Sequence, residues 1–493
     1  MHFSSLSDLR AASAPDAPCV ADATGDLSNS AFHSRVLAAA GAFSDQGIGI
    51  GDVVAVMLPN QVEFVVAMFA AWRLGAAVTP VKPSLTIKEA THQIGDSKAK
   101  LVVNTTGEIV VQGVQSMPAS RLREGKPLDG VPYTDPGALA LLIYTSGTTG
   151  LPKGVMLDHA NIEAMAEMGR HSLKVTASDH CLLVLPLFHV NAILVSTLLP
   201  LSVGGCVTLR ERFDIETFFD DIEQLRPTFF SAVPTIYALL NALPAQIKPD
   251  TSSLRYGICG AAPASAELLK NFEARYRFPL IEGYGLSEGT CGSTINPVDG
   301  LRKAGTVGLP FMGQRIAIAD PSGKHLPQGE TGEVLIQGAN VMRGYLGKPE
   351  ETERTIIDGW LHTGDIGRLD QDGYLSIVGR LKEMIIRGGE NIYPKEIEDV
   401  IAEFPGVLET AVIGAPHETL GEIVIAYVAF RSGFTGTPAA LDEHCADRLT
   451  RYKRPVAINI IDSLPKNAMG KIDKPKLRDQ WKQQALMNLA AHS

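Results

Sequence analysis

The sequence predicts an α/β protein with a large N-terminal domain of mainly parallel sheets, a β-rich subdomain and a small α+β C-terminal domain. Three observations predict it. Short apolar runs alternate with helical patterns before Pro310, short strands with Gly-containing turns follow, and a separate unit of strands and helices begins after Arg380. At 493 residues the chain exceeds one ordinary hydrophobic core, so we expect two or three domains.

The first strand–helix–strand unit is predicted between residues 51 and 81. Residues 51–59 contain a short apolar run, and the apolar residues of 60–76 recur at helical spacing until Gly75. Another short apolar run follows at 76–81. This order is typical of a parallel βαβ unit.

The same alternation recurs further along the chain. We expect strands at 99–105, 139–146, 226–234 and 254–262, and helices at 159–173, 235–243 and 264–276. Repeated βα units build an α/β core of about 300 residues, with ligands bound at the carboxyl ends of its strands.

The pattern after Pro310 predicts antiparallel strands at 329–338 and 370–380, with a turn at Asp372-Gly373. The C-terminal unit is predicted to contain strands at 382–389, 409–416 and 422–430 and helices at 393–407 and 441–452. The first of these helices has Pro394 near its start and carries Ile397, Val400, Ile401 and Phe404 on one face. We therefore divide the chain into domains 1–381 and 382–493, with a junction near Leu381-Lys382.

Composition excludes several classes of protein. The 45% hydrophobic and 20% charged residues are typical of a globular chain. A net charge of −10 argues against general nucleic-acid binding but not against a local ATP site. The six cysteines are scattered without metal-ligand spacing, which favours reduced thiols in a cytoplasmic enzyme.

Membrane insertion is not predicted. The first eighteen residues contain charges and no apolar core, unlike a signal peptide. Residues 181–207 are long and uncharged, but Pro186, His189, Asn191 and Pro200 interrupt them. We expect a buried strand, loop and helix there instead of a membrane span.

The stretch 144–157, YTSGTTGLPKGVML, combines Gly147, Gly150 and Gly154 with several hydroxyls and Lys153. Glycines let the backbone approach an anion closely, and the hydroxyls and lysine supply donors. The usual nucleotide-loop pattern is absent, because Lys153 follows Pro152 and precedes Gly154. These residues predict a phosphate-binding loop of another kind.

Five motifs occur in one order: YTSGTTGLPKG at 144–154, YGLSE at 284–288, LHTGD at 361–365, GRLKEMIIRGGENIYPKEIE at 379–398 and PKNAMGKIDK at 465–474. Each alone is modest evidence, and together they are specific. On these motifs the chain resembles, over essentially its whole length, the adenylate-forming superfamily. This superfamily includes acyl-CoA synthetases, firefly-type luciferases and peptide-synthetase adenylation domains.

The resemblance implies a two-step reaction with ATP, Mg²⁺ and coenzyme A. A carboxylate attacks the α-phosphate of ATP, giving an acyl-adenylate and pyrophosphate, and a thiol then displaces AMP. It also implies a mobile C-terminal domain that serves the two steps in two positions.

The resemblance implies a nucleotide site in the large domain. The loop residues that would hold the β- and γ-phosphates are Thr145, Ser146, Gly147, Thr148, Thr149, Gly150 and Lys153. Glu288 resembles the catalytic Mg²⁺ ligand, and Ser287 stands where threonine is usual. Tyr284 would face adenine, and its neighbours Gly283 and Gly285 would leave room for it.

Further implied roles fall near the C-terminal domain. Asp365 would accept both ribose hydroxyls, and Arg380 would contact the ribose-phosphate region. Lys471 resembles the catalytic lysine that bridges the substrate carboxylate and the α-phosphate. Lys382 holds the hinge position. Gly388 and Gly389 would keep a pantetheine channel open, although a simple turn also explains such a pair.

The acyl site is less specific. His189 matches the position of an aromatic gate for the carboxylate, although a hydrogen-bonded core histidine is the alternative. The predicted substrate-binding residues are His189, Asn191, Val233, Gly260, Ala261 and Gly285. The residues around them are apolar and small, which favours a monocarboxylic acid, with a fatty acid first and an aryl acid next.

Other substrates and functions are less favoured. Amino-acid-activating relatives have an aspartate in the stretch matching 187–192, and malonate-activating relatives have an arginine where this chain has Gly283. Loading of a carrier-protein thiol is an alternative to coenzyme A. A non-catalytic relative is a third hypothesis, which the intact Lys471, Glu288 and Asp365 disfavour. The helix predicted from 474 is either a homodimer contact or, as we favour, solvated.

Overall fold

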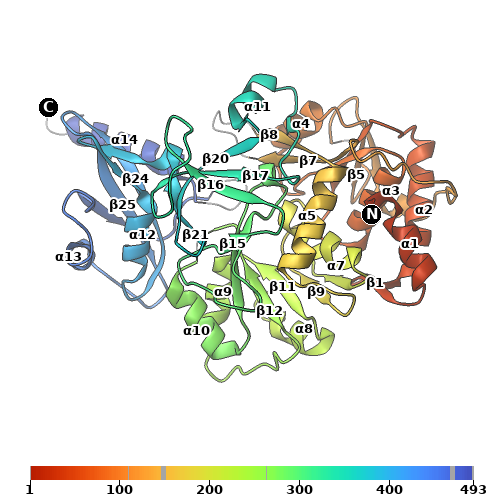
Figure 1. The fold of residues 1–493 in the computed structure, drawn as a ribbon, viewed down its shortest axis with the longest axis horizontal. Helices are drawn as coiled ribbons and strands as arrows, with labels where there is room; N and C mark the ends of the chain where they lie inside the picture. The colour runs from red at the N-terminus through yellow and green to blue at the C-terminus, as the bar shows by residue number, and fades with distance from the viewer. Residues whose placement is uncertain (1, 109, 146–151, 263, 467–471, 491–493) are drawn as a thin grey trace. The chain divides into compact units, whose positions relative to one another are not determined.

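A computed structural model describes residues 2–108, 110–145, 152–262, 264–466 and 472–490 (Figure 1). The chain forms two compact units. The first comprises Met1–Ile316, Leu335–His362 and Gly373–Leu375, and the second comprises Ala317–Val334, Thr363–Asp372 and Ser376–Ser493. The predicted α/β class is confirmed, whereas the domain boundary near Leu381-Lys382 stays a prediction.

The first unit contains a seven-stranded sheet of order β18-β8-β7-β4-β3-β5-β6. Its predicted βαβ unit is present, because β3 and β4 are parallel and α3 lies between them in sequence. The strands are β3 (Val53–Met57), β4 (Ala77–Pro80), β5 (Leu101–Asn104), β6 (Gln115–Pro118), β7 (Leu139–Thr145), β8 (Lys153–Asp158) and β18 (Gly344–Tyr345). The helical segments are α3 (Val62–Arg73), α4 (Ile87–Asp96), η2 (Ala119–Arg123), α5 (His159–Ser172) and α11 (Pro349–Thr355).

A nine-stranded sheet has the order β15-β14-β13-β12-β11-β9-β10-β1-β2. Neighbours from β13 through β1 are parallel, and the remaining strands at both edges are antiparallel. The strands are β1 (Pro18–Asp22), β2 (Gly25–Ser28), β9 (His180–Leu183), β10 (Cys206–Leu209), β11 (Phe229–Ala232), β12 (Tyr256–Cys259), β13 (Leu280–Tyr284), β14 (Thr294–Ile295) and β15 (Leu309–Pro310).

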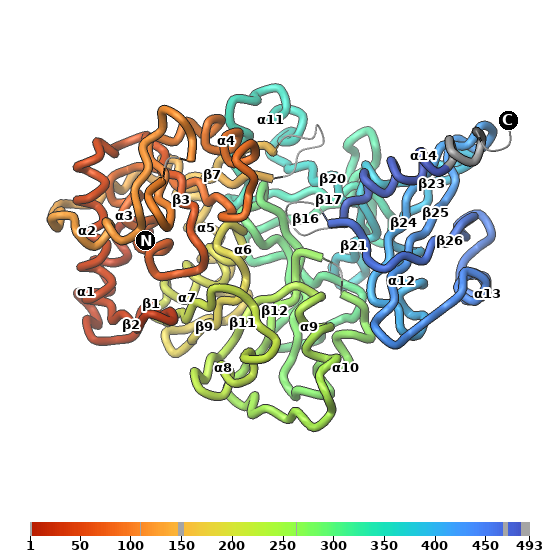
Figure 2. The backbone as a smooth tube through the Cα atoms, turned by 180° about the vertical axis from the view of Figure 1, so that it is seen from behind, coloured from red at the N-terminus to blue at the C-terminus, as the bar shows by residue number. Residues whose placement is uncertain are grey.

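Aromatic side chains attach helices to this sheet. Phe230 on β11 packs against Phe218 of α8 (Phe218–Leu225) and Tyr237 of α9 (Pro234–Asn241). Tyr237 in turn meets Phe272 of α10 (Ala266–Tyr276) edge-on, with ring centroids 5.0 Å apart. Edge-to-face rings add to the energy of burial. These helices lie together in the green part of both backbone views (Figures 1 and 2).

The N-terminal segment adds η1 (Phe3–Ser5), α1 (Leu6–Ser13) and α2 (Asn29–Asp45). Phe32 of α2 meets Phe69 of α3 edge-on, at 5.3 Å between centroids. Helices α1, α2 and α3 lie side by side in the red to orange part of the tube (Figure 2).

The long uncharged segment is confirmed as interrupted and buried. It contains β9, α6 (Val190–Ile193), the π-helical turn η3 (Leu194–Leu198), α7 (Leu199–Ser202) and β10. Among the described residues, no helix combines the length and the apolar composition that crossing a membrane requires.

A third sheet has the order β16-β17-β20-β19, with β21 beside β20. The predicted turn joins β20 to β21, and Gly373 adopts φ +83°, which a side chain would disfavour. The strands are β16 (Arg315–Ala319), β17 (Gly332–Gln337), β19 (Ile356–Ile357), β20 (Trp360–Leu369) and β21 (Leu375–Arg380).

The second unit also contains a sheet of order β23-β22-β25-β24, with β26 beside β25. Successive residues of its long strands face opposite sides of the sheet and belong to two separate hydrophobic clusters. Val412 belongs to the cluster with Ile397 and Leu441, and Ile413 belongs to the cluster with Leu477. Hence α12 and α13 cover one face and α14 the other. The elements are η5 (Leu381–Glu383), β22 (Ile385–Arg387), β23 (Glu390–Ile392), α12 (Pro394–Ala402), β24 (Val407–His417), β25 (Gly421–Phe430), α13 (Pro438–Ala446), β26 (Ala457–Ile460) and α14 (Lys474–Ala490).

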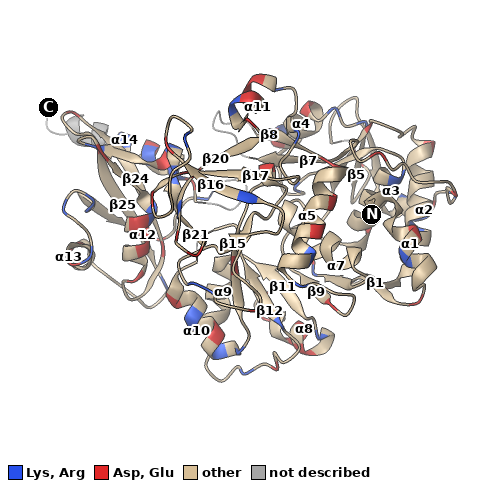
Figure 3. Ribbon diagram, viewed as in Figure 1, with Lys and Arg blue, Asp and Glu red and all other residues tan. Residues whose placement is uncertain are grey.

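Charges of both signs are interspersed along helices such as α10 and α11 (Figure 3). Mixed charges of this kind are typical of solvated helix faces and do not form a stripe for a polyanion.

Candidate functional site

The glycine loop joins two antiparallel strands. Thr145, the last residue of β7, pairs with Lys153, the first residue of β8. Strand β8 was not among the predicted strands, so the loop leads into a strand and only then into α5. The predicted phosphate-loop residues Ser146, Gly147, Thr148, Thr149 and Gly150 lie outside the described residues.

Lys153 lies in a network of polar groups. Its ammonium is ion-paired with Glu351 of α11 and stands 5.2 Å from the centre of the Tyr345 ring. The hydrogen bond from Lys153 lowers the pKa of Glu351. The side chain of Lys153 is only 14% exposed, so Glu351 and Tyr345 determine where its ammonium lies.

Tyr345 joins Lys153 to Glu288. The Tyr345 hydroxyl donates a 2.9 Å hydrogen bond to a carboxylate oxygen of Glu288, which lies on η4 (Ser287–Gly289). Burial, with the charge of Glu288, raises the pKa of Tyr345. The hydroxyl therefore stays protonated and orients the carboxylate. The N–H of Met342 holds the same turn by donating to the Glu288 carbonyl at 2.9 Å.

Four adjacent parallel strands, β9, β11, β12 and β13, end at one edge of the nine-stranded sheet. Predicted substrate residues follow three of them: His189 after β9, Val233 after β11, and Gly260 with Ala261 after β12. Ala261 adopts φ +66°, a conformation unusual for alanine. The structure thus brings these predicted residues to the edge where α/β sheets bind ligands.

His189 caps α6, and its ring packs on Phe188 with the centroids 4.4 Å apart. Glu282, on β13, is 5% exposed and accepts a 3.1 Å hydrogen bond from the N–H of Ala264. This contact ties the loop after β12 to the neighbouring strand.

Gly283 and Gly285 have a packing reason to be glycine. A Cβ at Gly285 would lie 1.6 Å from the carbonyl oxygen of Cys291, and one at Gly283 would lie 2.8 Å from Ile295. Tyr284 ends β13 between them, and Ser287 begins η4. The backbone after η4 is strained, because Cys291 adopts φ +94°.

Cys291 also brings Asn191 to this turn. Burial raises the pKa of the Cys291 thiol to about 12, and a hydrogen bond with Asn191 opposes that rise. Asn191 therefore holds the strained turn. The substrate role predicted for Asn191 stays a prediction.

Asp365 and Arg380 are brought together in the second unit. Arg380 Nε lies 3.0 Å from Asp365 Oδ1, and the Asp365 side chain is 5% exposed. The Asp365 N–H donates to Thr363 Oγ1 at 3.0 Å, and Thr363 Oγ1 donates to the Val334 carbonyl at 2.7 Å. The carboxylate is therefore positioned by β17, β20 and β21 together.

Lys471 lies outside the described residues, but Lys474, three positions later, begins α14. Its ammonium contacts Glu383 at 2.7 Å and Glu398 at 2.8 Å. The chain after the predicted catalytic lysine is thereby fixed to η5 and α12. Lys382, the predicted hinge residue, also lies on η5, and burial together with the charge of Arg380 lowers its pKa.

Gly388 and Gly389 form the turn between β22 and β23, with φ values of +61° and +88°. A two-residue hairpin turn with both central φ values positive strongly favours glycine. The turn explains the pair on structural grounds, and the predicted channel role remains untested.

Sequence reasoning missed four residues that the structure adds to these sites: Tyr345, Glu351, Cys291 and Lys474. Tyr345 carried a usable signal, since it lies between Gly344 and Gly347 as Tyr284 lies between glycines. Glu351 and Cys291 carried none, because their contacts are distant in sequence.

Comparison with known proteins covers nearly the whole chain. A family model described as AMP-binding enzyme matches residues 8–346, and one described as AMP-binding enzyme C-terminal domain matches residues 396–471. A feruloyl-CoA synthase from Amycolatopsis sp is 35% identical over 96% of this chain and 97% of its own. An oxalate–CoA ligase from Arabidopsis thaliana is 36% identical, over 91% and 92%. The long-chain-fatty-acid–CoA ligase FadD13 from Mycobacterium tuberculosis is 35% identical, over 88% and 89%.

Solved structures of similar fold cover nearly the whole chain. ATP-bound MatB from Rhodopseudomonas palustris has a TM-score of 0.92 and 31% identity, covering 98% of this chain and 99% of its own. The o-succinylbenzoate coenzyme A synthetase MenE from Bacillus subtilis, in complex with ATP and magnesium, has a TM-score of 0.88 and 29% identity, covering 97% and 99%.

Proposed function

Because this chain belongs to the AMP-binding enzyme family and is an AMP-forming acid–CoA ligase, we propose that it activates a monocarboxylic acid, with a fatty acid favoured and an aryl acid next. This proposal rests on the residues that follow the carboxyl ends of the adjacent parallel strands β9, β11, β12 and β13. The predicted substrate-binding residues that follow these strands are His189, Val233, Gly260 and Ala261, and three of the four are small or apolar. An apolar pocket with few polar groups suits a hydrocarbon chain or an aryl ring.

The substrates named for the relatives agree only in part with a preference for a fatty acid first and an aryl acid next. Among their names are a ferulate, a long-chain fatty acid and oxalate. The first two are monocarboxylic acids with apolar bodies, and the third is a dicarboxylic acid. The glycine at 283 supports the monocarboxylic reading, since no cation stands beside Tyr284 at that position.

For adenylation, the residues of the first unit fit Mg²⁺ and ATP. Glu288 supplies a hard carboxylate oxygen that Tyr345 orients, and Lys153 supplies a nearby cation. Bound Mg²⁺ would neutralise negative charge on the phosphates. Lys153 would then bind phosphate oxygens in place of Glu351, Asp365 would bind the ribose, and Lys471 would neutralise charge on the attacking carboxylate and the α-phosphate.

Coenzyme A is the proposed acceptor, and a carrier-protein thiol is the alternative. We expect the enzyme to act in the cytoplasm, because all six cysteines are free and most are buried.

Tyr345→Phe is expected to raise the half-saturating concentration of MgATP about fivefold, because the variant loses a hydrogen bond of about 1 kcal/mol to a carboxylate. Initial-rate measurements of pyrophosphate release against MgATP test this. The matched control is Tyr374→Phe, because Tyr374 also has a lysine over its ring, at 4.4 Å, and donates its hydroxyl to the Leu301 carbonyl. Equal effects in the two variants would contradict the role given to Tyr345.

Gly389→Val is expected to slow thioester formation from acyl-adenylate at least about 10-fold while leaving adenylation unchanged, if this turn lines the thiol channel. Single-turnover assays of each half-reaction measure the two effects. Gly433→Val is the control, because Gly433 has a similar φ of +84° and equally open space around a Cβ. If Gly433→Val slows the thioester step as much, the loss reflects backbone strain and not a channel.

The substrate class is tested by AMP formation with matched acids: decanoate, 4-coumarate, malonate and alanine, each with MgATP and coenzyme A. The proposal predicts turnover with decanoate or 4-coumarate and at least about 100-fold lower kcat/KM with malonate, whose second carboxylate would be buried without a partner. A preference for malonate or alanine would overturn it. Adenylate without any CoA thioester would favour carrier-protein loading.

A further inference from the structure

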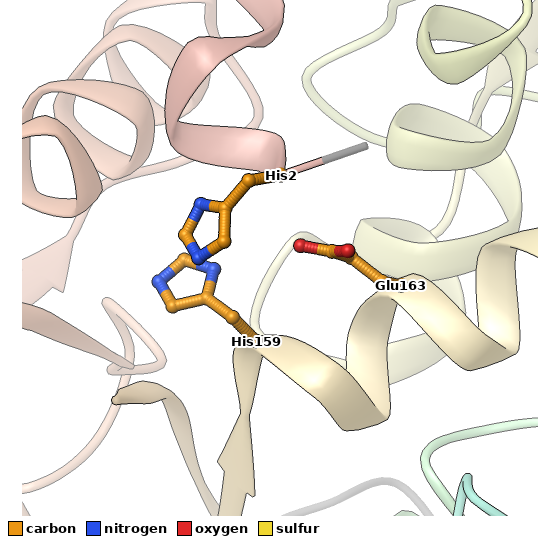
Figure 4. Close-up of side chains that lie close together, drawn as sticks. All are labelled: His2, His159 and Glu163. Carbon is orange, nitrogen blue, oxygen red and sulfur yellow. The ribbon is translucent and has the colours of Figure 1, made fainter. Parts of the chain in front are cut away.

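Three side chains converge where the start of the chain meets α5. His159 and Glu163 lie four residues apart, on one face of that helix, and His2 lies opposite them (Figure 4). One ligand atom from each of the three lies within 4.8 Å of the other two. None of the three belongs to the sites described above.

The His2 ring is held by polar groups on both sides. Its Nδ1 lies 2.7 Å from Ser4 Oγ, which donates to the Tyr133 carbonyl at 2.6 Å, and it accepts from the Ser4 N–H at 3.4 Å. Its Nε2 lies 3.3 Å from the Asp135 carbonyl oxygen. These contacts fix the orientation of the ring.

Metal-binding histidines usually have one ring nitrogen in contact with a protein oxygen and present the other nitrogen to the cation. The contact of His2 with Ser4, which in turn donates to the Tyr133 carbonyl, can supply this support.

His159 supplies the second nitrogen. The residue is 1% exposed, and among the described residues its Nδ1 has no hydrogen-bond partner. In the close-up, a nitrogen of its ring faces His2 and Glu163 (Figure 4). The His2 and His159 rings lie 4.2 Å apart, and Trp72 meets His159 edge-on at 5.5 Å.

We propose that His2, His159 and Glu163 bind one divalent transition-metal cation, with Zn²⁺ as the best match, and that the cation fastens the start of the chain to α5. Two imidazoles and one carboxylate are a known three-ligand set for Zn²⁺, and imidazole disfavours Mg²⁺ and Ca²⁺. The site is separate from the proposed Mg²⁺ ligand Glu288. The proposed binding of the cation does not depend on the proposed acid substrate.

The test uses full-length protein that begins with its own Met1 and carries no histidine tag. Zn²⁺ binding is titrated by calorimetry, and Co²⁺ is added separately for its visible absorption. His2→Ala and Glu163→Gln each remove one ligand at partly exposed positions, so that folding is retained. His171→Ala is the matched control, because His171 lies on the same helix beside Glu167, at 2.9 Å, and is exposed.

The expected result is one Zn²⁺ per chain in the wild type and in His171→Ala, with affinity at least 10-fold lower in His2→Ala and Glu163→Gln. Zn²⁺ should also raise the Tm of the wild type and of His171→Ala. It should not raise the Tm of His2→Ala or of Glu163→Gln. Equal affinity in all four proteins, or loss only in His171→Ala, would overturn the proposal. Absence of Zn²⁺ binding in the wild type would also overturn it.

Discussion

Replacing Lys471 by alanine is expected to slow acyl-adenylate formation by about 10²–10³-fold, while thioester formation from supplied acyl-adenylate stays within about twofold of wild type. The reason is electrostatic: a compact cation favours the charge that develops as the carboxylate attacks the α-phosphate. The second half-reaction breaks the acyl–phosphate bond by thiol attack and does not require that cation. Rapid-quench measurement of pyrophosphate release and of thioester formation separates the two steps.

Lys466→Ala is the control for that variant. Lys466 belongs to the same motif and is ion-paired with Glu409, so its loss removes a lysine charge without removing the proposed catalytic group. We expect its adenylation rate to match wild type. Equal losses in both half-reactions of Lys471→Ala would show that the lysine supports the fold or a common step.

Replacing Lys474 by methionine is expected to lower the free energy of unfolding of the second unit by about 2–3 kcal/mol. The change leaves Glu383 and Glu398 close together without their shared cation. Their side chains are 25% and 20% exposed, so water reduces the full cost of a buried unpaired charge. Urea unfolding followed by tryptophan fluorescence measures the loss, because Trp481 of α14 packs against the core that contains Ile413 and Leu477.

The effect of this variant should depend on pH. Burial alone would lower the pKa of Lys474, but Glu398 and Glu383 outweigh it and raise that pKa. Burial alone would raise the pKa of Glu383, but Lys474 outweighs it and lowers that pKa. Stability from Lys474 is lost as the pH rises through its raised pKa, and stability from Glu383 is lost as the pH falls through its lowered pKa.

The difference between wild type and Lys474→Met should therefore be largest between about pH 5 and pH 10. Lys453→Met is the matched control, because Lys453 has one carboxylate partner, Glu396, whose side chain is 44% exposed. We expect that control to lose less than about 1 kcal/mol. A pH-independent loss in Lys474→Met would contradict the ion-triad explanation and indicate lost packing.

Much of the fold could be predicted because its periodicity is local. The run 53–57, the helix Val62–Arg73 and the strand Ala77–Pro80 follow from apolar spacing and from Gly75 alone. Strand β8 was not predicted, because Lys153 and Gly154 at its start read as part of the glycine loop. Its strand character depends on pairing with β7 and β18, which lie on either side of it in the sheet.

Site residues could be predicted where they belong to a sequence motif. They could not be predicted where their position depends on packing between segments distant in sequence. Residues near 189, 233 and 260 follow the adjacent parallel strands β9, β11 and β12, and their role in substrate binding stays a prediction. The contact of Tyr345 with Glu288 joins residues 57 positions apart, and that of Lys474 with Glu383 joins residues 91 apart. Neither pair has a local pattern. The structure adds a packing reason for the glycines at 283 and 285, and their predicted role beside a ligand stays a prediction.

The most direct test of the central claim is a single-turnover experiment with enzyme in excess over radiolabelled ATP, with decanoate or 4-coumarate, and with coenzyme A added after a delay. Acyl-AMP and pyrophosphate are expected to form before the addition, and coenzyme A is then expected to convert the acyl-AMP to acyl-CoA and AMP at a rate no slower than turnover. Formation of ADP, or acyl-AMP that coenzyme A does not discharge, would contradict the central claim.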